Sequence, residues 1–280
     1  MAATLMEGRP LAERIRGAVA AEVVGLGGIG LATVLVGDDP ASEIYIGRKH
    51  EAAAAAGIDA RDVRLPPSTT EDELLRLVGE LNADDAVDAL LVQLPLPAHI
   101  DPDRVARAVD PAKDVDGFHP ENAGELYLGR PRLVPATAVG IMALLAEHRI
   151  LLTGARAVVV GRSAIVGKPV AHLLLQANAT VTVCHSRTED LARHTLDADV
   201  LVVAVGDAEV VTADMVKTGS VVVDVGMNRT ENGLVGDVDP DAADVAAFIT
   251  PVPGGVGPMT IACLLQNAVR CARLRRSGTY

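Results

Sequence analysis

Tyr45 and Lys49 are two side chains that could act together in acid–base chemistry, because they lie four residues apart in a stretch of helical composition. That spacing places both on one face of a helix, predicted over residues 42–56. The helix follows an apolar strand at residues 31–36, so its N-terminal half lies near the carboxyl end of a sheet, where α/β proteins bind ligands. A buried lysine beside an aromatic ring can act as a general acid or base, because burial lowers its pKa. The alternative is a solvated lysine on an ordinary surface helix.

A second candidate site is the glycine-bounded stretch at residues 161–171. It follows an apolar strand at residues 157–160 and leads into an apolar helix, which is the layout of a dinucleotide-binding turn. Arg162 and Ser163 stand where such a turn meets phosphate groups. A cation at that position suits a cofactor with an extra 2'-phosphate, so the sequence favours NADP over NAD. The alternative is a tight turn between strand and helix that binds no ligand.

The segment at residues 113–120 contains two carboxylates, Asp114 and Asp116, in a polar, glycine-kinked loop. Two carboxylates suggest a metal, but no further ligands at suitable spacing lie nearby. We therefore favour a carboxylate that accepts hydrogen bonds from an N–H-rich heterocycle. His119 precedes a proline, which is typical of a turn residue as well as of a catalytic one.

Two proline-rich loops offer further ligand-binding groups. Gln93 follows the predicted strand at residues 89–92 and begins a loop that two prolines stiffen. The loop at residues 250–260 contains three glycines and three prolines, so its backbone amides can meet a ligand, and a helix begins near Pro258. Featureless turns are the alternative for both.

Composition excludes several classes of function. The 280 residues are 49% hydrophobic but only 2% aromatic, and the net charge is −12, which argues against a nucleic-acid partner. No apolar run is long enough to span a bilayer, and the first 14 residues lack the apolar centre of a secretory signal. The three cysteines form no CxxC pair, so we expect free thiols in a reducing compartment, the cytoplasm, and no metal site.

Strand-like runs alternate with helical patterns along the whole chain, which predicts an α/β fold built from βαβ units with parallel sheets. Thr70 and Glu73 form a capping box that opens a helix. A loop-rich region at residues 110–139 separates two series of strands. We therefore predict one domain over residues 1–136, completed by a returning C-terminal helix at 259–280, and a Rossmann-like domain over residues 137–258.

Taken together, these segments resemble the bifunctional methylenetetrahydrofolate dehydrogenase/methenyltetrahydrofolate cyclohydrolase family, FolD. Each segment is short, but they occur in the family's order and cover nearly the whole chain. The matching segments are residues 45–49, 57–58, 92–97, 113–119, 161–169, 184–188, 224–226, 236–239 and 251–260.

The resemblance implies an N-terminal folate-binding domain, a Rossmann-like NADP-binding domain and a homodimer, in one-carbon metabolism. It implies that Lys49 is the central acid/base group, that Tyr45 flanks the folate, that Gln93 orients Lys49 and that Asp116 holds the pterin. The residues it implies for substrate binding are Tyr45, Lys49, Val92, Gln93, Leu94, Asp116, Pro253, Gly254, Gly255 and Val256. Those it implies for NADP binding are Gly161, Arg162, Ser163, Gly167, Ser186 and Met227, with Arg162 and Ser186 reading the 2'-phosphate.

Three positions depart from the family's pattern. Ala136 and Ala138 stand where the family often has cysteine and proline, and Glu51 stands where it tends to have a basic residue. These changes leave the balance of the two activities open. The alternatives are an NADP dehydrogenase with little cyclohydrolase activity, a silent nucleotide-binding homologue, and an unrelated α/β dehydrogenase. Retention of Lys49 and of the glycine turn argues against the first two.

Overall fold

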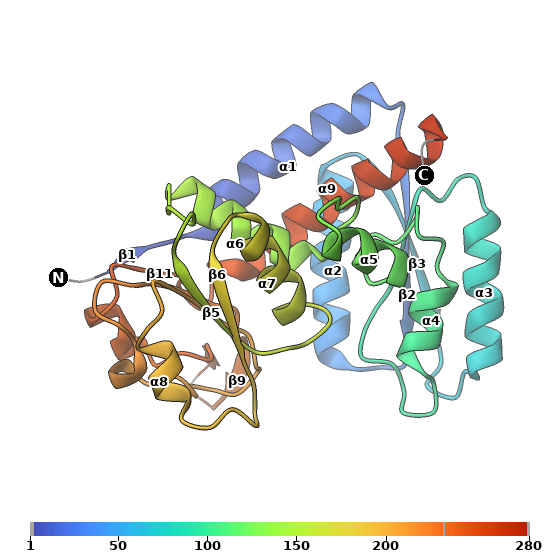
Figure 1. The fold of residues 1–280 in the computed structure, drawn as a ribbon. Coiled ribbons are helices and arrows are strands. Elements are labelled where there is room, and N and C mark those ends of the chain that lie inside the picture. Colours follow the sequence, from blue (N-terminus) through green and yellow to red (C-terminus); the bar gives the residue numbers. More distant parts are fainter. Residues whose placement is uncertain (1–2, 232, 279–280) are drawn as a thin grey trace. The chain divides into compact units, whose positions relative to one another are not determined.

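The chain forms two compact α/β units in a computed structural model that describes residues 3–231 and 233–278. The three-stranded unit comprises Glu13–Ala136 and the chain from Ile261 onward, and the six-stranded unit comprises the chain up to Ala12 and Thr137–Thr260. Both units contain parallel sheets connected by helices (Figure 1), which confirms the predicted fold class.

The sheet of the three-stranded unit has the order β3–β2–β4, with all strands parallel. β2 (Ile29–Val36) is central and almost continuously apolar, as a strand covered on both faces must be. β4 (Ala89–Val92) pairs with it on one side and β3 (Ile58–Leu65) on the other. β3 was not predicted, because its charged residues are those of an exposed edge strand and break up the apolar pattern.

The helices of this unit include α2 (Pro40–Ala55), α3 (Glu71–Ala83), α4 (Pro102–Ala108) and α5 (Pro120–Tyr127). α2 and α3 are the helices predicted at residues 42–56 and after Thr70, whereas α4 and α5 were not predicted. The capping box at the start of α3 is present, since the Thr70 side chain accepts from the Glu73 N–H while the Glu73 carboxylate accepts from the Thr70 N–H. α3 packs its apolar side chains onto the sheet, and its buried residues are Leu74, Val78 and Leu81.

Two helices run from one unit into the other along the chain: α1 (Gly8–Gly25) and α9 (Val256–Ser277). α9 is the predicted C-terminal helix, although it begins at Val256 rather than near Pro258. Its Asn267 amide donates to the carbonyls of Val115 and Val134, at 2.9 and 2.8 Å, within the three-stranded unit. The predicted return of this helix to the first domain is therefore present.

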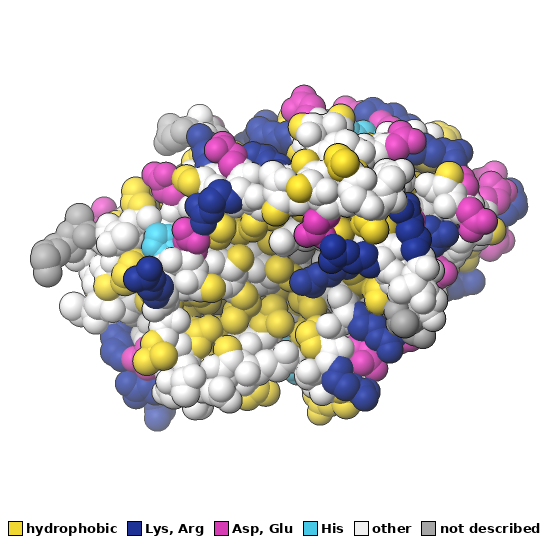
Figure 2. All heavy atoms as spheres, turned by 90° about the horizontal axis from the view of Figure 1, so that it is seen from above, with side chains coloured by type: hydrophobic (Ala, Val, Ile, Leu, Met, Phe, Trp, Pro, Cys, Tyr) yellow, Lys and Arg dark blue, Asp and Glu magenta, His cyan; other side chains and the backbone are white. Residues whose placement is uncertain are grey.

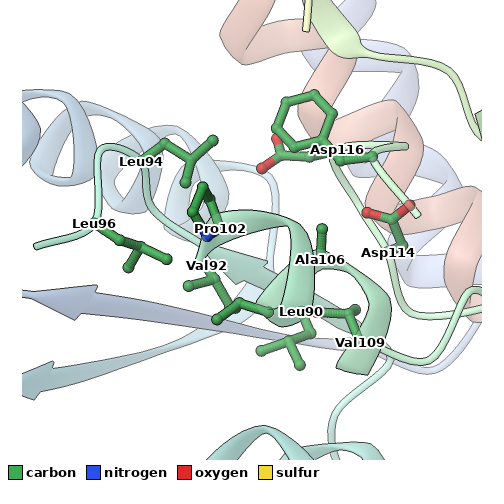
Figure 3. Close-up of a pocket in the computed structure, with 11 residues that line it drawn as sticks. Leu90, Val92, Leu94, Leu96, Pro102, Ala106, Val109, Asp114 and Asp116 are labelled. Atoms are coloured by element: carbon green, nitrogen blue, oxygen red, sulfur yellow. The ribbon is translucent and has the colours of Figure 1, made fainter. Parts of the chain in front are cut away.

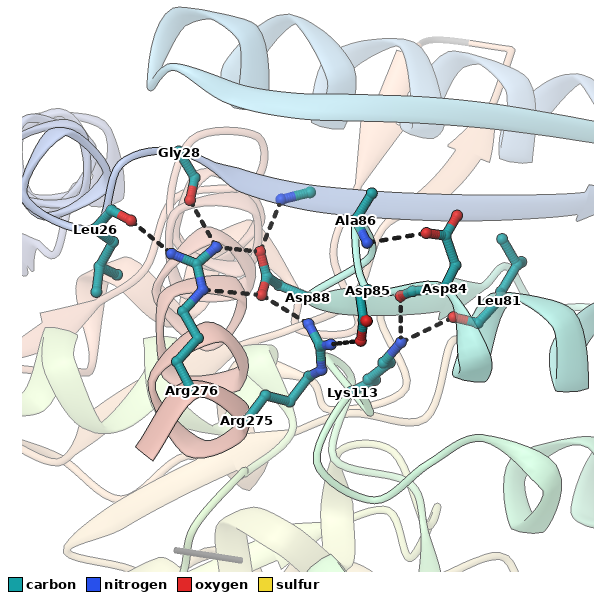
Figure 4. Close-up of polar contacts among 11 residues, drawn as sticks. Leu26, Gly28, Leu81, Asp84, Asp85, Ala86, Asp88, Lys113, Arg275 and Arg276 are labelled. Atoms are coloured by element: carbon teal, nitrogen blue, oxygen red, sulfur yellow. Dashed lines mark hydrogen bonds and ion pairs between the residues drawn. The ribbon is translucent and has the colours of Figure 1, made fainter. Parts of the chain in front are cut away.

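The end of α9 is anchored by the buried carboxylate of Asp88 (Figure 4). Arg275 Nη1 and Arg276 Nη2 lie 2.8 and 2.7 Å from its two oxygens, and the Gly30 N–H also donates to it. Arg276 donates in addition to the carbonyl of Gly28. Asp88 thus accepts from both arginines of α9 and from the backbone of β2. These charge-assisted bonds fix the end of the helix to the start of the strand.

The sheet of the six-stranded unit has the order β1–β11–β8–β7–β5–β6, again parallel throughout. β5 lies between β6 and β7, so the strand order reverses there, and this is the switch point at which such sheets bind nucleotides. The strands are β1 (Thr4–Leu5), β5 (Arg156–Val160), β6 (Thr180–Cys184), β7 (Val200–Val203), β8 (Val221–Asp224) and β11 (Phe248–Ile249).

Short elements complete this unit around the sheet. The helices are α6 (Ala136–Glu147), α7 (Gly167–Gln176) and α8 (Leu191–Thr195), with 3-10 turns at Ala213–Met215 and Pro240–Asp244. β9 (Asn228–Thr230) and β10 (Gly233–Val235) form an antiparallel hairpin. α5 and the start of α6 lie in the region that we predicted to be loop-rich.

The division into units differs from the predicted one at the N-terminus. Residues 3–12 group with the six-stranded unit, because β1 pairs with β11 and the Gly8 N–H donates to the Gly254 carbonyl at 2.9 Å. The second boundary lies two residues later than predicted, after Thr260.

On the face shown in Figure 2, lysine and arginine side chains lie among acidic ones and apolar atoms. Within residues 3–231 and 233–278, no helix is both long enough and apolar enough to cross a membrane.

Candidate active site

Lys49 is the centre of the candidate site in the three-stranded unit. Its side chain is buried on α2, with only 4% of the residue exposed, and its ammonium lies 4.6 Å from the centre of the Tyr45 ring. The predicted pair therefore meets across one helical turn, in cation–π geometry. The next residue, His50, lies 2.5 Å (Nε2 to Oγ1) from buried Thr33, and this contact ties α2 to β2 beside the lysine.

Gln93 holds the Lys49 side chain from the end of β4. Lys49 Nζ donates to Gln93 Oε1 at 3.1 Å, and Gln93 Nε2 donates to the Leu94 carbonyl at 2.6 Å. The Gln93 N–H donates to the Val34 carbonyl of β2, which fixes the backbone at the strand end. The bond from Gln93 Nε2 to the Leu94 carbonyl fixes the orientation of the side-chain amide. Gln93 Oε1 must therefore face the lysine. The peptide bond between Leu94 and Pro95 is cis.

Asp116 supplies the charge opposite Lys49. Burial raises the pKa of Asp116 to about 6, the ammonium of Lys49 opposes this rise, and Asp114 adds to it. Burial lowers the pKa of Lys49, and the Asp116 carboxylate opposes that fall. Burial therefore favours the neutral form of both groups, while the attraction between the ammonium and the carboxylate opposes each shift.

A pocket adjoins this pair at the end of β4. Apart from two carboxylates its lining is apolar (Figure 3), with Leu94 and Pro102 on one side and Asp114 and Asp116 on the other. The full set of lining residues is Leu90, Val92, Leu94, Leu96, Pro102, Val105, Ala106, Val109, Asp114, Asp116 and Phe118. Asp114 and Asp116 are therefore the polar groups of an otherwise apolar pocket.

The neighbours of Asp116 in sequence shape the loop instead of facing the pair. Asp114 accepts from the His119 N–H and the Asn122 amide, both at 2.8 Å. His119 Nδ1 accepts from the Glu121 N–H and so caps α5. Lys113 is buried and donates to the carbonyls of Leu81 and Asp84 (Figure 4). In the part of the chain that the structure describes, no three His, Cys, Asp or Glu side chains are grouped to hold a metal ion.

The glycine turn of the six-stranded unit lies between β5 and α7. Gly161 has a φ of 122°, and a Cβ there would lie 2.2 Å from the Ala204 carbonyl oxygen. A Cβ on Gly167 would lie 2.2 Å from the Gly161 carbonyl oxygen. Ser163 Oγ accepts from the N–H groups of Val166 and Gly167, both at 3.2 Å, so its hydroxyl hydrogen points away and can donate to a ligand.

Arg162 and Ser186 follow two neighbouring strands. Gly161 donates to the Cys184 carbonyl at 2.9 Å, which joins the end of β5 to the end of β6. Both Arg162 and Ser186 are exposed just beyond these ends. They can therefore present donors at one edge of the sheet, as the prediction for a 2'-phosphate requires.

The remaining predicted residues also belong to the six-stranded unit. Met227 is 54% exposed, three residues after the end of β8. Residues 253–255 lie in the turn that enters α9, and Val256 is the first residue of that helix. A Cβ on Gly255 would lie 2.8 Å from the Pro251 carbonyl oxygen. The ligand roles of Met227 and of residues 253–256 stay predictions.

Two buried residues of this unit were given no role by the sequence analysis. Asp224 and Asp237 are 4% and 0% exposed, and both lie in segments that match the family's pattern. The signal that could have found them is the glycine beside each, because Gly226 and Gly236 leave room for a carboxylate where a Cβ would collide.

Comparison with known families decides the identity. Residues 6–116 match the catalytic-domain model of tetrahydrofolate dehydrogenase/cyclohydrolase, and residues 135–276 match the NAD(P)-binding-domain model of the same family. The chain belongs to this family. The resemblance drawn from the sequence is therefore confirmed.

Individual members of the tetrahydrofolate dehydrogenase/cyclohydrolase family align with the chain over nearly its full length. The bifunctional protein FolD of Acidiphilium cryptum is 57% identical, over 99% of this chain and 100% of that protein. The crystal structure of the bifunctional FolD enzyme of Campylobacter jejuni has a TM-score of 0.96 and 46% identity, over 98% of this chain and 100% of that one. The Trypanosoma brucei FolD, complexed with NADP and an inhibitor, has a TM-score of 0.93 and 38% identity, with both chains fully covered at 100%.

Family membership confirms the predicted enzyme class, a combined dehydrogenase and cyclohydrolase acting on tetrahydrofolate derivatives, and the predicted nicotinamide cofactor. The family's catalytic-domain model covers Tyr45, Lys49, Gln93 and Asp116, and its nucleotide-domain model covers Arg162 and Ser186.

Proposed function

We propose that the chain oxidises 5,10-methylenetetrahydrofolate with NADP and hydrolyses the resulting 5,10-methenyltetrahydrofolate to 10-formyltetrahydrofolate. The observation that carries the proposal is the buried Lys49, held by Gln93 at 3.1 Å and coupled to Asp116. Few functions require a lysine whose pKa burial lowers, positioned at a strand end beside an aromatic ring. We place both reactions in one-carbon metabolism.

The six-stranded unit fits NADP. No side chain fits at Gly161 or Gly167 of its turn. The phosphates of the cofactor can therefore approach the backbone of this turn closely. Ser163 can donate to them, and Arg162 and Ser186 offer donors for the 2'-phosphate. When bound, NADP accepts a hydride from the methylene carbon of the folate.

In the oxidation, the three-stranded unit positions the folate and controls charge. The Asp116 carboxylate accepts hydrogen bonds from the pterin N–H groups, and Tyr45 packs against the folate ring system. Loss of the hydride leaves a cationic methenyl ring. Because burial favours the neutral form of Lys49, the amine repels this cation less than an ammonium would.

In the hydrolysis, Lys49 moves the protons. Water attacks the methenyl carbon, and the amine of Lys49 takes one proton from it. The lysine then gives that proton to the ring nitrogen as its bond to carbon breaks, while the remaining hydroxyl proton is released as the formyl C=O forms. Gln93 Oε1 holds one N–H of Lys49 throughout and so directs the lone pair of the amine.

Two assays of the purified chain test this function. The first starts from methenyltetrahydrofolate without nucleotide and should show hydrolysis well above the rate without protein. The second starts from methylenetetrahydrofolate and should form NADPH with NADP. Oxidation without accelerated hydrolysis would contradict the proposed role of Lys49, and absence of both would contradict the function as a whole.

We expect Arg162→Ala to raise the KM for NADP about ten- to a hundredfold and to leave the KM for NAD nearly unchanged. The reason is that the guanidinium can bind the 2'-phosphate through two parallel hydrogen bonds, which NAD lacks. Steady-state kinetics with both cofactors measure the change. Arg193→Ala, which removes an exposed cation from α8 and leaves the glycine turn unchanged, is the matched control and should leave both values unchanged. Equal or better use of NAD by the wild type would contradict the assignment.

We infer that the protein forms a homodimer through β6. Among the described strands β6 pairs only with β5, so its outer edge presents unpaired N–H and C=O groups. Val183 on this strand is 40% exposed, which suits an apolar contact. Sedimentation should give about twice the chain mass of 29.0 kDa, whereas a single species at the chain mass would contradict the dimer.

We place the protein in the cytoplasm. Its three cysteines, Cys184, Cys263 and Cys271, are buried free thiols, and burial raises the pKa of each. Unpaired, unreactive thiols are typical of a reducing compartment.

A further inference from the structure

Two buried carboxylates, Asp224 and Asp237, meet at the carboxyl end of the six-stranded sheet. Asp224 ends β8, and Asp237 follows the β9–β10 hairpin. The Asp237 N–H donates to Asp224 Oδ1 at 2.9 Å, and the Gly226 N–H donates to the same oxygen at 2.8 Å. Asp224 thereby fixes the backbone that carries Asp237.

The carboxylate of Asp237 holds two loops. Its Oδ2 accepts from the N–H groups of Val205 and Gly206, at 2.7 and 2.9 Å, directly after β7. Its Oδ1 accepts from the Asn228 side-chain amide at 2.8 Å, and Asn228 adjoins Met227. One side chain therefore bridges the segment after β7 and the segment after β8.

Gly226 and Gly236 leave room for the two carboxylates, because neither glycine carries a side chain. A Cβ on Gly226 would lie 2.2 Å from Asp237 Oδ1, and a Cβ on Gly236 would lie 1.7 Å from Asp224 Oδ2. The three groups that face the Asp237 carboxylate are all donors. An amide at this position could accept with only one of its two terminal atoms, so it would leave part of the set unpaired.

The bridged loops lie beside the glycine turn. Ala204 donates to the Val160 carbonyl at 2.8 Å, and its own oxygen lies against Gly161. The turn after β7 therefore forms the other wall of the switch point between β5 and β7. Ser186 follows β6, and the adenosine ribose of NADP is proposed to bind beside it. The nicotinamide half would then lie on the opposite side of β5, beside the segments that follow β7 and β8.

We propose that Asp237 is a positioning residue for the nicotinamide half of NADP, which it orders through Val205, Gly206 and the Met227 segment without touching the cofactor. This inference rests on the proposed function. If it is correct, loss of the Asp237 carboxylate loosens the segment after β7 and the segment after β8, at one end of the cofactor site. The Lys49 site in the three-stranded unit contains none of these residues.

The test uses Asp237→Asn in the full-length chain, with Asp239→Asn as the matched control. Asp239 lies two residues further on and caps a 3-10 turn by accepting from the Asp241 N–H. We expect Asp237→Asn to weaken NADP binding in calorimetry about ten- to a hundredfold. We also expect faster amide hydrogen exchange at Val205 and Gly206 and unchanged hydrolysis of methenyltetrahydrofolate without nucleotide. Asp239→Asn should leave NADP binding and both exchange rates at wild-type values.

Each outcome decides between specific alternatives. If wild type binds NADP and Asp237→Asn binds it equally well, the inference is overturned while the proposed function stands. If hydrolysis falls in parallel with NADP binding, Asp237 is merely structural and the inference is again overturned. If wild type binds no NADP, the proposed function itself fails. Asn228→Ala, which removes the donor to Asp237 Oδ1 together with its bond to the Gly236 carbonyl, should weaken NADP binding in the same direction and serves if Asp237→Asn does not fold.

Discussion

Lys49→Met is expected to slow methenyltetrahydrofolate hydrolysis at least about a hundredfold while NADP still binds with wild-type affinity. Methionine keeps most of the apolar stem of the side chain but can neither take a proton from water nor return it to the ring nitrogen. The buried side chain loses its hydrogen bond to Gln93, yet no residue of the glycine turn changes. Hydrolysis rates without nucleotide and calorimetric titration with NADP measure the two effects separately.

The matched control for this experiment is Arg48→Met, which removes a cation from the exposed face of α2 one residue earlier. It should leave both hydrolysis and NADP binding unchanged. Hydrolysis by Lys49→Met at near the wild-type rate would show that another group moves the protons, and the assignment of Lys49 would be wrong.

Asp116→Asn is expected to weaken folate binding about ten- to a hundredfold, because a hydrogen bond to a buried charged group contributes about 1.5 to 3 kcal/mol. In the wild type, the KM for folate should rise as the pH falls through about 6, the pKa of Asp116, since the protonated acid can no longer accept from two N–H groups. The KM of the Asp116→Asn variant should not change as the pH falls through about 6. Steady-state kinetics between acid and neutral pH measure both effects.

The same substitution should change stability in the opposite direction. The pKa of Asp116 lies above its ordinary value of 3.8, so the neutral form stabilises the fold fully at low pH and that stabilisation is lost as the pH rises through about 6. Asp116→Asn stays neutral and should therefore raise the melting temperature above pH 6 and have little effect below pH 4.

Asp114→Asn is the informative comparison, because Asp114 accepts hydrogen bonds from the His119 N–H and from the Asn122 amide on α5. It should lower stability more than folate binding. A variant at position 116 that loses stability and keeps its folate response would show that Asp116 is a structural residue.

The candidate site was predictable where chemistry depends on local spacing. Tyr45 and Lys49 meet because residues four apart share a helical face, and Gln93 reaches them because strand ends gather at one edge of a parallel sheet. The capping box at Thr70 was predictable for the same reason, since both of its bonds join residues three apart. Local periodicity and sheet topology are both encoded in short stretches of sequence.

Features that depend on contacts between distant segments were not predictable. β3 contains four charged residues among its eight and so lacks a clear apolar pattern, yet it pairs with the whole length of β2. β1 is two residues long and is defined only by its pairing with β11, about 240 residues away in the chain. Asp88 and Asp237 look like ordinary loop acids in the sequence. Their burial follows from partners, such as Arg276 for Asp88, that no spacing rule connects to them.

Isotope tracing with dideuterated 5,10-methylenetetrahydrofolate, NADP and heavy-oxygen water tests the central claim most directly. If the chain catalyses both steps, one deuterium must appear on the nicotinamide ring of NADPH and the other must stay on the formyl carbon of 10-formyltetrahydrofolate. The heavy oxygen must appear in that formyl group, at a rate that Lys49→Met greatly reduces. Unlabelled NADPH, or methenyltetrahydrofolate that accumulates and hydrolyses no faster than without protein, would contradict the account.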